Sequence, residues 1–256
     1  MDRYGLCMKR HGEKLTPAQK PFARDDDEFP ATEEPIDLLT VIKHVKPNVL
    51  IGCSTRPGSF TKEIVQEMAS HVERPIIFPL SNPTRLHEAQ PNDINEWTHG
   101  KALIATGSPF PPVIHDGKEY EVAECNNCLV YPGLGLGCVL SRASRCTDDM
   151  IVAAAHGLAE LSPALKDPDK ALLPDIKDVR ETSVNVALHV IQQCVKEKLH
   201  RVHFIPTDEN ELREWIEDQM WKPEYRVLQK VDPVYASKAA RGELGMKARQ
   251  SIISLF

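Results

Sequence analysis

The first half of the chain alternates short apolar runs with longer amphipathic stretches. The short runs are typical of strands buried in a parallel sheet, and they fall at Val49–Ile51, Ile76–Leu80 and Leu103–Ala105. Helical periodicity precedes and separates them, at Glu34–Val45, Ser59–Ser70 and Pro91–Trp97. Ser59 is expected to cap the second of these helices. Asp116-Gly117 predicts a hairpin turn between Val113–Ile114 and Tyr120–Val122. Strands alternating with helices indicate an α/β fold with a parallel sheet.

The pattern changes beyond residue 132. Helices are expected over four segments, Leu134–Ala143, Asp148–Leu161, Ile176–Lys198 and Glu209–Trp221. Residues 8–33 are polar, with an acidic run from Asp25 to Glu28, and show no clear periodicity. They are therefore predicted to be a solvated loop, and the second half of the chain to be mostly helical.

Composition narrows the choice of partner and compartment. The 256 residues are 41% hydrophobic and 27% charged, as in an ordinary globular protein, and the net charge is -6. An acidic chain is a poor partner for nucleic acid, whose phosphates need a basic surface. No apolar stretch approaches the ~20 residues that span a bilayer. Seven irregularly spaced cysteines indicate reduced thiols, as in the cytoplasm or the mitochondrial matrix, and no targeting segment is visible.

Polar loops follow the predicted strands. Ser81–Thr84 and Gly107–Phe110 come directly after two of the apolar runs, and Asn126-Asn127 follows the hairpin. In an open α/β sheet, ligands bind outside the carboxyl ends of the strands. Neutral amides and hydroxyls there suit a small polar ligand beside a cofactor.

The loop 52–58, which contains Gly52, Cys53 and Ser54, joins a strand to a helix. Backbone N–H groups at such a helix start attract anions, and a glycine lets a cofactor approach the main chain. On this segment alone an ordinary strand-to-helix connection is the better interpretation. The segment also begins like a Gly-x-Ser-x-Gly nucleophile elbow, but Arg56 replaces the last glycine, which argues against a hydrolase.

Two further motifs invite functional interpretations that the spacing does not favour. Gly133, Gly135 and Gly137 resemble a dinucleotide fingerprint, but the third glycine is misplaced, so we expect them to allow close helix packing. Cys125 and Cys128 form a Cys-x-x-Cys that suits half a zinc site or a redox pair, without a matching second pair.

Five motifs in order point to a family. They are Asp2–Leu6, Pro47–Gly52, Arg74–Thr84, Gly107–Phe110 and Asn126–Gly133. Together they resemble the malic enzymes, the NAD(P)-dependent oxidative decarboxylases of malate. The similarity continues through residues 172–174 and the long helix after them. It is weakest at residues 7–33 and after residue 223.

The resemblance implies an architecture. Residues 1–126 would form most of a Rossmann-type NAD-binding domain, incomplete at its N-terminus and entered at the end of its second strand. Residues 127–200 would be a helical segment of the catalytic domain, and residues 201–256 the C-terminal extension. Members of the family associate as homo-oligomers, dimers or tetramers.

The resemblance also assigns cofactor contacts. Asp2 would bind the adenosine ribose, and its carboxylate would favour NAD by repelling the 2′-phosphate of NADP. Arg3 beside it keeps NADP open. The remaining cofactor contacts would come from Gly52, Cys53, Ser54 and Asn82. For Asp2 by itself, without the resemblance, solvation at the terminus is the simpler interpretation.

Substrate contacts follow from the same likeness. Asn82, Asn126 and Asn127 would bind malate, because side-chain N–H groups orient an anion without adding a titrating group. The family converts (S)-malate to pyruvate and CO2 with a lysine base, a tyrosine acid and carboxylates that bind Mg²⁺ or Mn²⁺.

Those groups, and the Gly-rich phosphate turn, belong to family segments that would precede Met1, so no catalytic residue and no metal ligand is identified in this sequence. The polypeptide alone is therefore expected not to oxidise malate. A fragment and a genuine short protein both remain open. Two different hypotheses are an NAD- or partner-binding remnant without catalysis and a Cys-x-x-Cys redox or zinc protein.

Overall fold

The computed structural model describes residues 1–2, 5–29 and 35–225. Contacts divide the chain into two compact units. The first unit comprises Met1–Asn127 and the returning segment Leu161–Ile176, and the second comprises Cys128–Glu160 and the chain from Lys177 onward. No helix among the described residues is both long and apolar enough to cross a bilayer.

The first unit is built on a parallel sheet, as the alternating pattern predicts. Its strands are β1 (Val49–Gly52), β2 (Ile76–Pro79), β3 (Leu103–Thr106) and β6 (Ala123–Glu124), in the order β1-β2-β3-β6. All three pairings are parallel, so the four carboxyl ends lie at one edge of the sheet. The sequence pattern did not predict β6, which is only two residues long.

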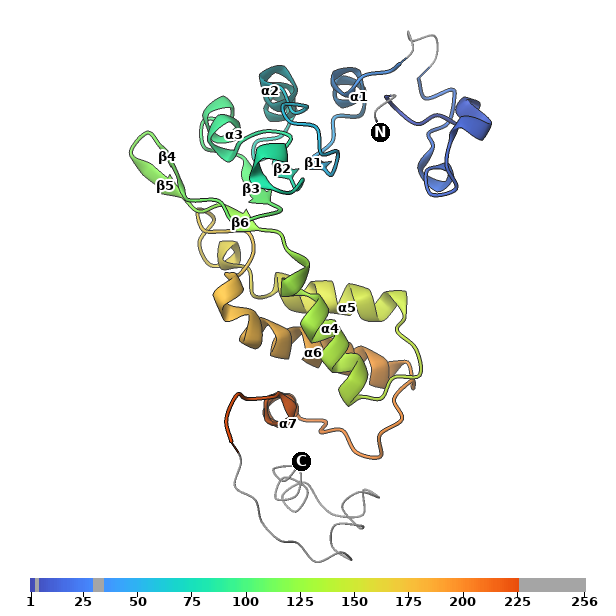
Figure 1. Ribbon diagram of the computed structural model, residues 1–256, viewed down its shortest axis with the longest axis vertical. Helices are drawn as coiled ribbons and strands as arrows, with labels where there is room; N and C mark the ends of the chain where they lie inside the picture. The colour runs from blue at the N-terminus through green and yellow to red at the C-terminus, as the bar shows by residue number, and fades with distance from the viewer. Residues whose placement is uncertain (3–4, 30–34, 226–256) are drawn as a thin grey trace, which may run out of the picture. The chain divides into compact units, whose positions relative to one another are not determined.

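Three helices pack on one face of this sheet, side by side in the same order as the strands (Figure 1). They are α1 (Leu38–Val45), α2 (Lys62–His71) and α3 (Pro91–Trp97). The core between helices and sheet includes the fully buried Ile42, Val65, Met68, Ile77 and Ile94. Burial of such side chains contributes about 1.5–3 kcal/mol each. On the opposite face of β1, Val49 and Ile51 are 44% and 57% exposed.

Capping explains where the helices begin. Asp37 accepts a hydrogen bond from the N–H of Thr40 at 2.8 Å, so α1 begins at Leu38, later than predicted. This bond also lowers the pKa of the Asp37 carboxyl. The cap of α2 is Thr61, so the prediction of Ser59 was wrong. The N–H of Phe60 is held by the carbonyl of Glu88 at 3.0 Å, which keeps Phe60 out of the helix.

Residues 8–29, the described part of the predicted solvated loop over residues 8–33, confirm it only in part: most of their side chains are exposed, but the segment is not irregular throughout. The segment contains two 3-10 helices, η1 (Lys9–Lys14) and η2 (Lys20–Phe22). Met8 and Phe29 are buried in a small cluster with Leu6 and Ile36. The buried residues are too far apart in sequence to produce a periodic signal, which is why the pattern missed them.

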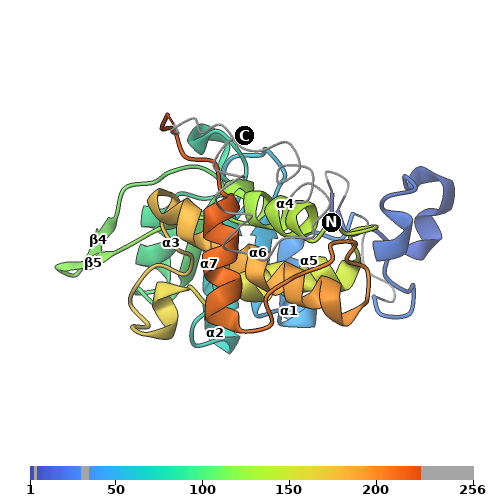
Figure 2. The ribbon, with the colours of Figure 1, turned by 90° about the horizontal axis from the view of Figure 1, so that it is seen from below.

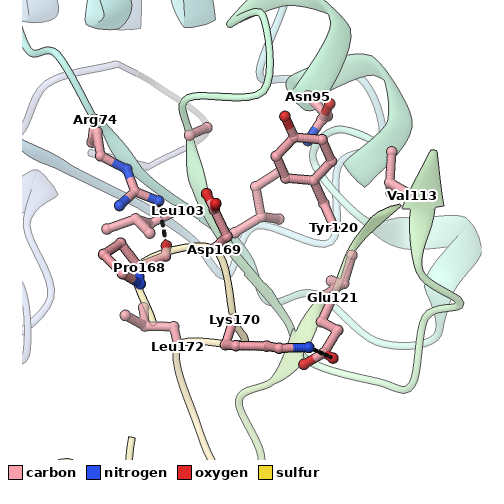
Figure 3. Close-up of a pocket in the computed structure, with 13 residues that line it drawn as sticks. Arg74, Asn95, Leu103, Val113, Tyr120, Glu121, Pro168, Asp169, Lys170 and Leu172 are labelled. Carbon is pink, nitrogen blue, oxygen red and sulfur yellow. Dashed lines mark hydrogen bonds and ion pairs between the residues drawn. The ribbon is translucent and has the colours of Figure 1, made fainter. Parts of the chain in front are cut away.

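The returning segment, which includes η5 (Pro163–Leu165), completes the first unit beside a hairpin. The hairpin strands β4 (Val113–His115) and β5 (Lys118–Tyr120) confirm the predicted turn at Asp116-Gly117. Arg74 donates to the carbonyl of Pro168 at 2.8 Å, and Lys170 lies 3.1 Å from Glu121 (Figure 3). These residues line a pocket of about 30 Å³, room for about two water molecules.

The described part of the second unit is helical. Its helices are α4 (Tyr131–Leu140), α5 (Asp148–Ala159), α6 (Val179–Lys196), preceded by η6 (Ile176–Asp178), and α7 (Glu209–Gln219). Both α4 and α5 pack against α6, as Figures 1 and 2 show. Thr147 caps α5 by accepting from the N–H of Met150.

Two glycines set the approach of α4 to α6. A Cβ at Gly133 would lie 2.5 Å from Cβ of Val186, and one at Gly137 would lie 2.7 Å from Cγ1 of Val190. Gly135, between them, faces open space. The prediction that these glycines serve close helix packing is confirmed for Gly133 and Gly137.

Candidate functional site

The loops at the carboxyl ends of β1, β2 and β3 lie next to one another. The N–H of Leu80 donates to the carbonyl of Gly52 at 2.9 Å, which joins the first two loops. A Cβ at Gly107 would collide with the carbonyl oxygen of Leu80 and lie 2.9 Å from Oδ1 of Asn82. The β3 loop therefore approaches the β2 loop as closely as a glycine allows. The arrangement brings Gly52, Cys53 and Ser54 to the same sheet edge as Asn82.

The paired asparagines follow the next strand. The N–H of Cys125 donates to the carbonyl of Thr106 at 2.8 Å, which anchors the chain after β6 to β3. Asn126 donates from Nδ2 to Glu124 at 2.9 Å, and Asn127 begins the short η4 (Asn127–Leu129). Both side chains and that of Asn82 are exposed, so their amides are accessible to a ligand.

A buried carboxylate that the sequence pattern did not reveal lies under the first two loops. Glu88 is 0% exposed. Its Oε1 accepts from the backbone N–H of Ser54 at 2.7 Å, from Oγ of Ser54 at 2.8 Å and from Oγ of Ser81. Burial raises the pKa of Glu88, but the hydrogen bonds from Ser81 and Ser54 outweigh it, so the net pKa is lowered and the group stays ionised. No sequence signal marks Glu88, because Ser54 lies 34 positions away.

The adjacent His87 reaches the third loop. It is 1% exposed, and its Nε2 lies 3.3 Å from Oγ of Ser108. The Ser108 hydroxyl is also 3.2 Å from Oγ1 of Thr84 in η3 (Thr84–Leu86). Burial lowers the pKa of His87, so its imidazole is neutral at physiological pH.

The predicted ribose contact lies in a different setting from a strand end. Asp2 forms an isolated antiparallel bridge with Gly5, and its Oδ2 accepts from Nε2 of Gln19 at 2.6 Å. Its side chain is exposed. The prediction for Arg3 falls outside the described residues.

The metal and thiol hypotheses raised by the sequence gain no support from the geometry. Among residues 1–2, 5–29 and 35–225, no three His, Cys, Asp or Glu side chains gather where they could hold a metal ion. Cys125 and Cys128 are not joined by a disulfide bond. Burial, with a contribution from Cys53, raises the pKa of Cys125, which disfavours the reactive thiolate.

The pocket beside Arg74 and Asp169 is separate from the loops at the carboxyl ends. It adjoins the amino end of β3, and none of the predicted site residues lines it. Room for about two waters is too little for a cofactor or a dicarboxylic acid. The candidate site is therefore the exposed loop edge rather than this cavity.

Comparison with known proteins identifies the family. The family model described as "Malic enzyme, NAD binding domain" matches residues 1–195. The chain belongs to the malic enzyme family. An NAD-dependent malic enzyme of Schizosaccharomyces pombe is 47% identical over 227 residues, which cover 88% of this chain and 40% of that protein. A mitochondrial NAD-dependent malic enzyme of Saccharomyces cerevisiae is 46% identical over 245 residues, covering 90% of this chain and 36% of that protein.

Solved structures show the same malic enzyme fold. The Entamoeba histolytica malic enzyme matches with a TM-score of 0.60 at 22% identity, over 83% of this chain and 39% of that one. The Pyrococcus horikoshii malic enzyme matches with a TM-score of 0.52 at 23% identity, over 68% and 36%. The chain thus spans about 40% or less of the length of these malic enzymes.

Proposed function

We propose that this chain is the cofactor- and substrate-contacting part of an NAD-dependent malic enzyme, which converts (S)-malate to pyruvate and CO2. The observation that carries the proposal is the meeting of the β1, β2 and β3 loops at one sheet edge, in a chain of this family. Ligands of open α/β sheets bind at such edges. The two yeast relatives described above are both NAD-dependent malic enzymes, which supports NAD as the cofactor.

Each predicted residue has a role in this proposal. Gly52, Cys53 and Ser54 would line the cofactor, and NAD, when bound, supplies the acceptor for the hydride leaving malate. Asn82 would contact the nicotinamide side and the substrate. Asn126 and Asn127 would donate N–H groups to malate oxygens, holding the anion without exchanging a proton with it.

The preference for NAD rests in this proposal on Asp2. Its exposed carboxylate would accept hydrogen bonds from the ribose hydroxyls of NAD and repel the ribose 2′-phosphate of NADP. Gln19 would then exchange its hydrogen bond to Asp2 for solvent when the ribose binds.

Among the described residues no three His, Cys, Asp or Glu side chains lie together to hold the divalent metal ion that the family uses. For the 256-residue polypeptide by itself we expect NAD binding without malate oxidation, since the acid, base and metal-ligand motifs of the family do not occur in its sequence. We further propose association with a second copy, and a location in the cytoplasm or the mitochondrial matrix.

Calorimetry on the purified chain tests the proposal. We expect NAD to bind more tightly than NADP, and Asp2→Asn to narrow that difference. Asn127→Ala should abolish any effect of malate on NAD binding, whereas Asn92→Ala, an exposed asparagine on α3, should not. A titration with NAD that shows no binding would contradict the proposed cofactor site. Reduction of NAD in the presence of malate and Mn²⁺ would contradict the expectation that the chain alone does not oxidise malate.

A further inference from the structure

Two adjacent buried polar side chains, His87 and Glu88, contact all three loops of the candidate site. They lie between η3 and α3 in the sequence. Burying an ionisable group costs desolvation free energy, which hydrogen bonds or a paired charge must offset. No cationic side chain among the described residues forms an ion pair with Glu88, and its charge is balanced by hydrogen bonds instead.

The hydrogen bonds to Glu88 run in one direction. The N–H of Thr55 donates to Oγ of Ser81 at 2.8 Å, and that hydroxyl donates to Glu88. The N–H of Arg56 donates to Oγ of Ser54 at 3.2 Å, and that hydroxyl also donates to Glu88. Each serine hydroxyl therefore bridges the carboxylate and a backbone N–H of the β1 loop, donating to the first and accepting from the second. Ser81 belongs to the β2 loop, so the same carboxylate couples the two loops.

The backbone of the β1 loop shows that it is held in an unfavourable conformation. Thr55 is β-branched and adopts a φ of 55°. A non-glycine residue there costs roughly 1–2 kcal/mol, and such conformations persist where the surroundings enforce them. Gly52 fits this arrangement because a Cβ at that position would lie 2.5 Å from Cδ of Glu88. Glu88, Gly52 and Thr55 therefore depend on one another: the carboxylate holds the loop, the glycine makes room for the carboxylate, and the threonine keeps its unfavourable conformation.

His87 connects this hydrogen-bonded network to the β3 loop. Its contact with Ser108 and the contact of Ser108 with Thr84 tie the third loop to the second. One dipeptide thus links the segments that carry Ser54, Asn82 and Ser108.

We propose that Glu88, assisted by His87, is a positioning residue of the cofactor site, which fixes the register of the three loops so that they present one preformed surface to the nicotinamide cofactor. The inference rests on the proposed function, because it takes the loop edge to be the NAD site. Neither side chain touches the cofactor in this proposal, since both are buried. Preformation lowers the ordering cost of binding and so raises affinity.

The test uses the full chain with Glu88→Ala, Glu88→Gln and Ser81→Ala, and Glu96→Gln as the matched control on the exposed face of α3. NAD affinity is measured by calorimetry well below the melting temperature, and amide hydrogen exchange is read at Ser54, Thr55 and Ile77. We expect Glu88→Ala to weaken NAD binding about tenfold or more, because hydrogen bonds to a charged group are lost. Glu88→Gln should have a smaller effect, because one oxygen remains to accept, and Glu96→Gln none.

Exchange distinguishes positioning from a merely structural role. Ser54 and Thr55 should exchange faster in Glu88→Ala, while Ile77 in β2 keeps its protection. If Glu88→Ala does not fold, Ser81→Ala carries the test, because it removes only the hydroxyl between Thr55 and Glu88. An unchanged NAD affinity in folded Glu88→Gln and Ser81→Ala, beside a wild-type chain that binds NAD, would overturn the positioning role alone. A wild-type chain that does not bind NAD would overturn the proposed function, and the positioning role with it.

Discussion

Substituting single glycines of α4 tests whether helix packing in the second unit is set by the absence of side chains. In Gly137→Ala the new Cβ would lie 2.7 Å from Cγ1 of Val190 and 3.0 Å from the backbone oxygen of Ala187. A valine can rotate, but the backbone of α6 cannot, so the helices must move apart. Such overpacking costs about 2–3 kcal/mol, and the better helix propensity of alanine returns about 1 kcal/mol. The expected net loss is about 1–2 kcal/mol of unfolding free energy.

Gly135→Ala is the matched control, because it makes the same chemical change where a Cβ meets open space. It should gain the propensity term alone, about 1 kcal/mol of stability. The two variants should therefore differ by about 2–3 kcal/mol in chemical denaturation followed by circular dichroism. Amide exchange in α6 should show the same difference, and it isolates the second unit from the first. Equal stabilisation of both variants would refute the close-packing argument.

Two further predictions concern capping and pH. Asp37→Ala should remove the hydrogen bond to the N–H of Thr40 and cost about 1 kcal/mol in denaturant unfolding, and the reasoning fails if Gln66→Ala, at an exposed position of α2, costs as much. The pKa of His87 is lowered by burial, so below its ordinary value of 6.5 the unfolded chain binds more protons and stability should fall on acidification. Glu88, whose pKa is also lowered, should add to this loss only below about pH 4.5. In melting temperatures measured from pH 7.5 to 5, His87→Gln should flatten the fall, and an unchanged slope would contradict the assignment.

Elements whose signal is local were predictable from the sequence. The three apolar runs became β1, β2 and β3, and α3 has the predicted bounds because Pro91 marks its start and the apolar face is compact. Elements that depend on distant partners were not. Thr61 rather than Ser59 caps α2 because Phe60 is held by Glu88, and β6 exists because it pairs with β3.

The candidate site divides in the same way. Gly52, Ser54 and Asn82 could be placed at one sheet edge because strand ends are readable in the sequence. The supporting layer could not, because a buried carboxylate among neutral neighbours has no periodic signature. The contribution of Glu88 and His87 can be recognised only in the fold, which brings Ser54, Ser81 and Ser108 within hydrogen-bond distance of them.

Residues 161–176 return to the first unit between two parts of the second, and this limits how the two units can be expressed separately. The polypeptide passes between its two units three times, at 127/128, 160/161 and 176/177. A clone that stops after residue 127 would leave Glu121 and Arg74 without the partners that Lys170 and Pro168 supply. A clone that begins at residue 128 would contain residues 161–176 without the first unit, against which they pack. Attempts to express either unit separately should splice around this stretch or fuse it to the first unit, since no single truncation point yields both units whole.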